Sequence, residues 1–272
     1  MKFRSGTEIV DQRKMRGSVL IVLVTLVVLS TLSIDTVTSA AAQQNGTPGE
    51  STYAGCGQVV SGVVNLTSNL NCSGDGFVVS GPNTVINMNG FSITGPGQDS
   101  SKVGIMVTNI DNVVVNGPGS ISNFQAGVLL TGTNGFKINS VTLSNNQIGT
   151  FMTGADNAQV QQNIIQKNNI GIASHSSSGS KISSNLISAN ILAGITFVNT
   201  KDSNLYLNNV HGSQSGIFLD GQSTDNTISA NNVLENVFDL NNANGLPTNI
   251  NANQYVDNRC DRSNPSGLCI GR

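Results

Sequence analysis

The chain has 272 residues, of which 10% are charged and 38% hydrophobic, and its formal net charge at pH 7 is −2. Its polar residues are mainly Asn, Ser, Thr, Gln and Gly, whereas most disordered chains are highly charged, so the composition does not suggest disorder. The near-zero net charge and the lack of a basic patch argue against a nucleic-acid-binding protein.

The first 42 residues have the pattern of an export signal. Five basic side chains precede an apolar run from Val19 to Ile34, and small residues suited to signal peptidase follow near Ala42. The apolar run is close to the shortest length that spans a membrane, so an uncleaved anchor at residues 19–34 is the alternative. We therefore expect an extracellular, cell-surface or periplasmic protein that meets the membrane only through this segment. A linker over residues 43–55 is expected to follow.

The main signal in the rest of the chain is a repeat with a period of 22 to 23 residues, apart from a first unit of 28. Apolar residues recur one and three places after an aligned glycine, and again near places eleven and sixteen. A fixed period of this length predicts a solenoid. Helical repeats are disfavoured because Asn, Gly, Thr and Ser fill the interior of each unit. The aligned positions are Gly76, Gly104, Gly127, Gly149, Gly171, Gly194, Gly216 and, in the last unit, Asp239.

The apolar groups predict three short strands in each unit, separated by turns, with alternate side chains facing inward. Identical positions then stack at the inter-strand spacing, and seven or eight coils make a rod of roughly 35 to 40 Å. The fold class is therefore an all-β, three-sided parallel β-helix over residues 56–258. The longer first unit contains GPGQDSSK, which we expect to form a loop that leaves the coil.

Four cysteines lie at the two ends of the predicted coil. Cys56 and Cys72 lie at its start, and Cys260 and Cys269 lie at its end. Four cysteines allow three pairings, and in an exported chain we expect two local disulfides. A redox or metal role would need a Cys-x-x-Cys pair or nearby histidines, and neither is present. We interpret both ends, including residues 259–272, as caps on the solenoid.

Asparagine recurs at two further positions of the unit. Inward turns bury backbone groups that need hydrogen-bond partners, and stacked Asn side chains can provide them as amide ladders. A ligand-binding row of amides is the alternative interpretation. The predicted ladders consist of Asn123, Asn146, Asn168 and Asn190, and of Asn163, Asn185, Asn208 and Asn231.

These patterns resemble a known family. The stretch CGQVVSGVVNLTSNLNCSGDGFVVSGPNTVINMNGFSITGPG, followed by GIMV and NVVVNGPGSISNFQAGVLL, is similar to secreted right-handed parallel β-helix proteins of the NosD-like and pectate-lyase-like group. The resemblance covers roughly residues 53–258 and implies a right-handed coil. It implies little about function, because this fold carries lyases, epimerases, hydrolases, adhesins and accessory proteins.

The outward face of the first strand in each unit carries the candidate ligand site. Phe151 and Phe218 are expected to stack against sugar rings, with His175 and Asp220 as polar partners. The alternative is an apolar stripe that a loop or a partner covers. His175 and Asp220 are also the candidate catalytic residues, although two coils, about 9 to 10 Å, separate them in this register.

The positions of the possible ligands bear on two metals, calcium and copper. Four aspartates lie in similar turns: Asp111, Asp156, Asp202 and Asp225. Turn chemistry explains them directly, and a calcium row is the alternative, although the calcium-binding Gly-Gly-x-Gly-x-Asp frame is absent. Copper, which the NosD-like resemblance implies, is not supported, because His175 and His211 are predicted to face different sides without a Met pair or a Cys-His cluster. No cofactor is therefore expected.

Three functions are consistent with these residues. The favoured one is a non-catalytic surface or periplasmic module that contacts extracellular polysaccharide or an envelope protein. The first alternative is a polysaccharide lyase, epimerase or hydrolase, for which paired carboxylates are not evident, because Glu235 is the only Glu between Ser51 and the end. The second alternative is a structural spacer on a membrane anchor.

Overall fold

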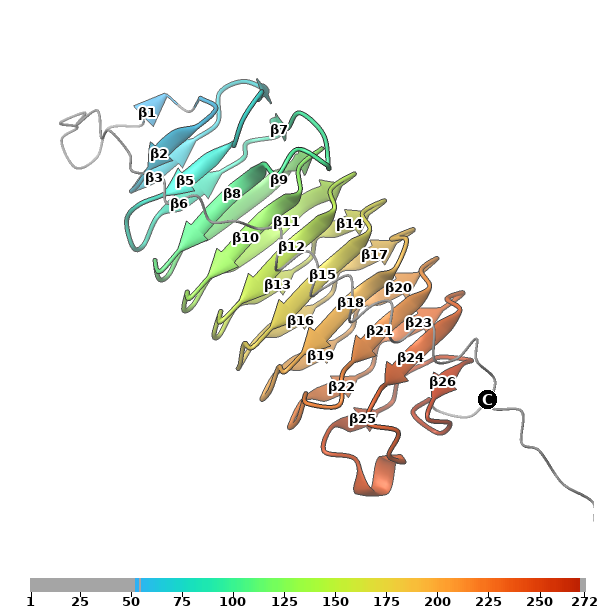
Figure 1. Cartoon of the computed structure of the whole chain (residues 1–272). Coiled ribbons are helices and arrows are strands. Elements are labelled where there is room, and N and C mark those ends of the chain that lie inside the picture. The colour runs from blue at the N-terminus through green and yellow to red at the C-terminus, as the bar shows by residue number, and fades with distance from the viewer. Residues whose placement is uncertain (1–51, 54, 270–272) are drawn as a thin grey trace, which may run out of the picture. The chain divides into compact units, whose positions relative to one another are not determined.

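The computed structural model describes residues 52–53 and 55–269, and its strands stack as successive coils from β1 to β26 (Figure 1). The predicted export signal and anchor lie outside these residues. No helix among the described residues is long and apolar enough to cross a membrane. The described part has one helix, the short 3-10 helix η1 (Thr248–Ile250). The predicted all-β parallel β-helix is therefore confirmed.

Ten parallel strands form the first sheet, one from each coil. Two of them, at the two ends, lie beyond the series of eight aligned positions that the sequence predicts. The strands are β2 (Gln58–Val60), β5 (Phe77–Val79), β8 (Val103–Thr108), β10 (Ala126–Thr131), β12 (Ile148–Thr153), β15 (Ile170–His175), β18 (Ala193–Val198), β21 (Ser215–Leu219), β24 (Phe238–Asn242) and β26 (Ser263–Asn264).

A 16-stranded sheet supplies the other two sides of the coil, because two of its strands, β9 and β11, continue from the second side onto the third. The second side consists of β1 (Thr52–Tyr53), β3 (Val63–Asn65), β6 (Val85–Asn87), β9 (Val114–Ser122), β11 (Lys137–Ser144), β13 (Gln159–Gln161), β16 (Lys181–Ser183), β19 (Asn204–Tyr206), β22 (Thr227–Ser229) and β25 (Gln254–Val256). The third side consists of β4 (Leu70–Asn71), β7 (Ser92–Thr94), β14 (Ile164–Gln166), β17 (Leu186–Ser188), β20 (Asn209–His211) and β23 (Asn232–Leu234), together with the second halves of β9 and β11.

The interior is built from columns of identical positions, as the repeat predicts. Ile172, Ile195 and Ile217 are direct neighbours in β15, β18 and β21, and all three side chains are fully buried. Each column continues through the coils above and below, so burial of apolar surface is shared evenly along the axis.

Buried asparagine ladders run along two of the inward turns. Asn208, in the bend between the second and third sides, shows the pattern. Its Nδ2 donates to Ile182 O at 2.8 Å and to Asn231 Oδ1 at 2.9 Å. Its Oδ1 accepts from the backbone N–H and the Nδ2 of Asn185 at 3.1 and 2.9 Å. Each amide therefore bonds the coils on both sides of it.

The structure departs from the predicted ladder at Asn123. The backbone N–H of Phe124 donates to Asn146 Oδ1 at 3.0 Å, so Phe124 occupies the ladder position, and Asn123 is half-buried beside it. The register of β9 against β11 shifts by one residue between Asn139 and Val141. Because β9 contains this extra residue, the ladder position of this coil lies one residue further from Gly104 than the repeat predicts.

Disulfides close both ends of the described coil. Cys56 pairs with Cys72, and Cys260 pairs with Cys269, which is the local arrangement that the sequence favours. Strand pairing extends past the predicted bounds, since β1 pairs with β3 and β26 pairs with β24. The segments interpreted as linker and cap therefore both add a short strand to the solenoid.

Replacing both Cys56 and Cys72 by Ser is expected to lower the free energy of unfolding of the N-terminal coils by about 3 kcal/mol, because the bridge closes a 16-residue separation. Each coil contacts only its neighbours, so the effect should stay local. Hydrogen exchange should show lost protection in β2 and β5 and unchanged protection in β15 and β18. Equal loss of protection in all coils would contradict this expectation.

Candidate functional site

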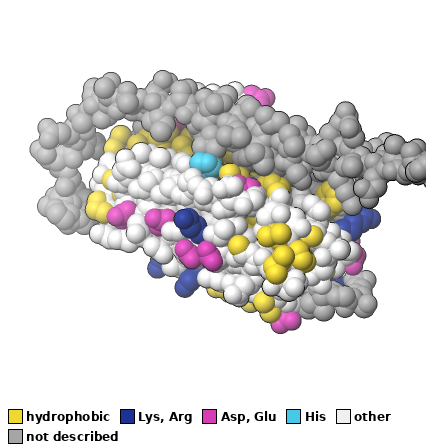
Figure 2. Space-filling model, turned by 60° about the horizontal axis from the view of Figure 1, so that its bottom comes forward, with side chains coloured by type: hydrophobic (Ala, Val, Ile, Leu, Met, Phe, Trp, Pro, Cys, Tyr) yellow, Lys and Arg dark blue, Asp and Glu magenta, His cyan; other side chains and the backbone are white. Residues whose placement is uncertain are grey.

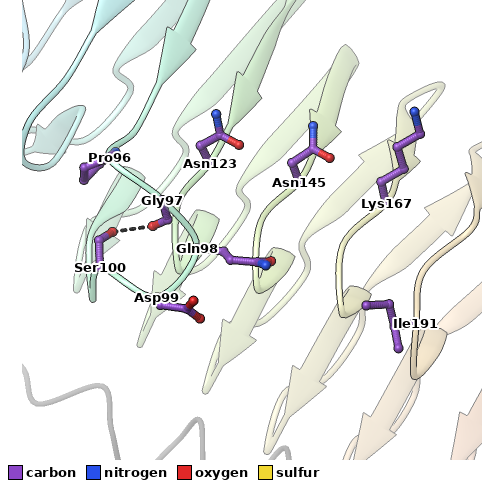
Figure 3. Close-up of a pocket in the computed structure, with 9 residues that line it drawn as sticks. All are labelled: Pro96, Gly97, Gln98, Asp99, Ser100, Asn123, Asn145, Lys167 and Ile191. Carbon is purple, nitrogen blue, oxygen red and sulfur yellow. Dashed lines mark hydrogen bonds between the residues drawn. The ribbon is translucent and has the colours of Figure 1, made fainter.

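A hollow of about 600 Å³ lies where a loop overhangs the turn that leads from the third side of the coil into the first sheet. We call it the loop hollow. Nine residues line it: Pro96, Gly97, Gln98, Asp99, Ser100, Asn123, Asn145, Lys167 and Ile191 (Figure 3). The first five belong to the loop. The other four, Asn123, Asn145, Lys167 and Ile191, come from four successive coils, so the hollow extends along the coil axis.

The loop is the insertion that the long first unit predicts, and the next coil holds its backbone in place. The N–H of Gly95 donates to Ser122 O at 2.8 Å, and the N–H of Gly97 donates to Asn123 O at 2.9 Å. Within the loop, the Ser100 hydroxyl donates to Gly97 O, as Figure 3 shows. Gln98 and Asp99 remain exposed at the tip. The loop therefore presents one amide and one carboxylate over the turn.

The floor of the hollow is a repeated turn position. Asn123, Asn145 and Lys167 occupy it in consecutive coils, each in the left-handed region with φ between 54° and 59°. Their side chains point in the same direction in Figure 3. Asn is common at such a φ because its side chain tolerates it, whereas Lys is unusual there. The result is two amides and one ammonium group in a line along the coil axis, beside the loop.

A second hollow, of about 420 Å³, lies on the same turn near the C-terminal end, and we call it the cap hollow. Its lining residues are Ser213, Glu235, Asn236, Val237, Asp239, Asp261 and Arg262. Asp239 is buried, and its carboxylate accepts from the backbone N–H and Nδ2 of Asn236 and from the N–H groups of Asp261 and Arg262. This carboxylate therefore ends an asparagine ladder, and Glu235, Asp261 and Arg262 form the exposed charged rim.

Phe151 and Phe218, the rings predicted to bind sugar, are 1% and 0% exposed. Because side chains alternate along a strand, both rings lie on the outward faces of β12 and β21. They line neither the loop hollow nor the cap hollow. Sugar stacking on these two rings stays a prediction.

The candidate catalytic pair is not brought together. His175 ends β15, and its neighbour in the next coil is Val198, so a full coil separates it from the coil of Asp220. The Asp220 carboxylate accepts from the Ser223 hydroxyl at 2.7 Å and from the N–H groups of Asn199 and Gln222 at 3.1 and 3.2 Å. Asp220 therefore acts as a turn-stabilising residue in this structure.

Two of the four turn aspartates bond the neighbouring coil through their carboxylates. Asp111 accepts from the N–H of Asn134, and Asp156 accepts from the N–H and hydroxyl of Ser178, each at 2.8 Å. Within residues 52–53 and 55–269, no group of three His, Cys, Asp or Glu side chains could hold a metal ion. These hydrogen bonds join neighbouring coils and account for the carboxylates of Asp111 and Asp156.

Comparisons with known proteins agree on the fold. Residues 68–264 match the family described as periplasmic copper-binding protein (NosD). No curated protein matches the chain. DFA-IIIase from Arthrobacter chlorophenolicus A6, crystallised without its lid, is similar in structure, with a TM-score of 0.52 and 14% sequence identity over 72% of this chain. The match covers 56% of the DFA-IIIase chain, so the present chain spans little more than half of it.

Two further solved structures show weaker similarity. Pectate lyase Pel9A has a TM-score of 0.49 and 12% identity, with 78% of this chain and 68% of that chain covered. Tailspike protein 2 from Escherichia coli O157:H7 bacteriophage CAB120 has a TM-score of 0.48 and 11% identity, with 74% and 38% covered. The similarity to DFA-IIIase, at 14% identity, shows the fold alone.

The family description names copper, but the described residues do not fit a copper site. His175 lies on the first sheet and His211 on β20 of the 16-stranded sheet. All four cysteines are in disulfides, Met88 and Met152 are buried in the core, and Met106 lies on β8, three strands from β15 in the first sheet. The soft and imidazole ligands that copper prefers are therefore scattered. Because the family match covers more than half of the sequence, the chain belongs to the NosD family of β-helix proteins.

Proposed function

We propose that this protein is an exported, non-catalytic module that binds a neutral polysaccharide in the loop hollow. The observation that carries the proposal is a single hollow lined by three amide residues, Gln98, Asn123 and Asn145, together with Asp99 and Lys167. Amides both donate and accept hydrogen bonds, whereas carboxylates accept and ammonium groups donate. This mixture suits a ligand covered with hydroxyl groups, which also donate and accept.

The balance of charge favours a neutral glycan over a polyuronate. Asp99 and Lys167 place one charge of each sign in the loop hollow, so there is no excess of cations to attract carboxylates. Figure 2 shows a face of the coils on which acidic and basic side chains are both present among uncharged groups and backbone. The export that we expect and the periplasmic description of the family are consistent with a glycan ligand outside the cytoplasm.

The test is a glycan array on the exported protein, with product analysis of every glycan that binds. We expect at least one neutral polysaccharide to bind and to be recovered intact. Lys167→Ala should weaken binding of that glycan about tenfold, since a hydrogen bond to a charged donor contributes about 1.5 kcal/mol. Lys167 is exposed, so the substitution should leave the fold unchanged.

The matched control is Lys201→Ala, which removes an exposed lysine from the turn between the first and second sides of the coil. We expect it to change binding less than twofold. Equal effects of the two substitutions would place the binding site elsewhere. Release of shortened or unsaturated sugars would show that the protein is an enzyme instead.

A further inference from the structure

We infer that the loop hollow and the cap hollow are two ends of one groove, and that one extended neutral polysaccharide lies in it parallel to the coil axis, at about one sugar per coil. The inference rests on the proposed function and adds the direction, length and register of the ligand. We call the whole feature the edge groove, because it follows the single turn that joins the third side of the coil to the first sheet.

The two hollows share the same repeated turn positions. In each coil, the residue just before the buried ladder position and the residue just after it both face outward. Stacking of the coils turns these residues into two outward rows, one on each side of the ladder. The first row is Asn123, Asn145, Lys167, Ala189, Gly212 and Glu235, and the second is Gln147, Asn169, Ile191, Gln214 and Val237. Both rows contribute to both hollows, since Lys167 and Ile191 line the loop hollow and Glu235 and Val237 line the cap hollow.

Backbone hydrogen bonds connect the hollows without interruption. The N–H of Ala189 donates to His211 O at 3.0 Å, and the N–H of Gly212 donates to Glu235 O at 3.3 Å. In the second row, the N–H of Gln214 donates to Ile191 O at 3.2 Å. The coils that line the loop hollow are therefore stacked directly on the coils that line the cap hollow, and in the same regular way.

The first row has its smallest side chains where the two hollows adjoin, in the last coil of the loop hollow and the first coil of the cap hollow. Ala189 and Gly212 are both exposed, and both have a left-handed φ, of 52° and 73°. At the same position, neighbouring coils carry Lys167 on one side and Glu235 on the other. A chain molecule can therefore pass from one hollow to the other over a low floor, held at both ends by longer polar side chains.

The spacing of the coils matches a polysaccharide. From Asn123 to Glu235 the first row takes five steps of about 4.8 Å, or roughly 24 Å. A pyranose in an extended chain advances by a similar distance, so successive sugars meet equivalent turn positions. In the second row, Ile191 and Val237 are 66% and 56% exposed, and each offers an apolar contact for the C–H face of a sugar ring.

The charges along the edge groove favour a neutral chain. Its exposed acids are Asp99, Glu235 and Asp261, and its exposed bases are Lys167 and Arg262. Acids exceed bases by one, and two of the three acids lie at the cap hollow. A polyuronate that entered at the loop hollow would therefore meet like charge at the other end.

The test compares neutral oligosaccharides of three and six sugars, with β-1,4 and α-1,4 linkages (cello-, manno- and malto-oligosaccharides), by calorimetric titration of the exported protein. For any series that binds, we expect the hexasaccharide to bind at least tenfold more tightly than the trisaccharide. Ala189→Leu places bulk without hydrogen-bonding groups where the two hollows adjoin. It should weaken hexasaccharide binding at least tenfold and change trisaccharide binding less than twofold.

The matched control is Ala230→Leu. Ala230 is also exposed with a left-handed φ, of 53°, but it lies in the bend between the second and third sides, where Leu207 occupies the same position of the preceding coil. This control should bind both lengths as the original protein does. Equal affinity for three and six sugars, or a hexasaccharide unaffected by Ala189→Leu, would overturn the axial groove but leave the proposed function standing. If no oligosaccharide of either length binds, the proposed function fails and the inference fails with it.

Discussion

Asn208→Ala is expected to lower the free energy of unfolding by about 3 kcal/mol, measured by urea denaturation of the exported protein. Asn208 is 1% exposed, and its side chain takes part in hydrogen bonds to Ile182, Asn185 and Asn231. Alanine would leave the carbonyl of Ile182 and the N–H of Asn185 without these partners in the interior. Stranding buried polar groups in this way costs about 1 to 3 kcal/mol each.

The neighbouring residue provides the control for this ladder. Asn209 is exposed, and its side chain accepts one hydrogen bond from Asn232 at the surface. Asn209→Ala should change the free energy of unfolding by no more than about 0.5 kcal/mol. If both substitutions had the same small effect, the buried ladder would not stabilise the coil, and the explanation of the repeated asparagines would be wrong.

Gly216→Ala is expected to destabilise the protein by about 3 kcal/mol, because there is no space for a methyl group. A Cβ on Gly216 would lie 2.6 Å from Asp239 O and 2.8 Å from Asn236 Nδ2, and it would also collide with the Val233 side chain. The Asp239 carbonyl belongs to the next coil, and its position is set by the parallel strand pairing. It cannot move away without disturbing that pairing.

Gly221→Ala tests whether the effect is one of space. Gly221 follows β21 in the same coil, and a Cβ there would meet no heavy atom nearer than Asn244 Cα at 3.9 Å. We expect a change of at most about 0.5 kcal/mol, which thermal and urea unfolding can both detect. A large loss from Gly221→Ala, or none from Gly216→Ala, would contradict the packing argument.

The candidate site was less accessible to sequence reasoning than the fold. The long first unit correctly indicated a loop outside the coil, but the pattern of outward residues pointed to the strand face with Phe151 and Phe218. The loop hollow combines that loop with side chains from four coils. The sequence does contain a pattern that indicates the loop hollow, since Asn123, Asn145 and Lys167 share one turn position. Counting residues from the aligned glycine placed Asn123 in the buried ladder, and this concealed the shared position.

The sequence by itself determined the solenoid, its period, its apolar columns and the need for buried amides at the turns. It could do so because each of these features depends on residues at fixed offsets within one unit, and stacking repeats the same local contacts in every coil. Only the tertiary structure decided which amides are buried and which are exposed. The extra residue in β9 shifts the register by one place, and a shift of one residue exchanges inside for outside. The tertiary structure likewise decided that the loop lies over the turn edge, because that placement depends on contacts between coils and on no pattern within a single one.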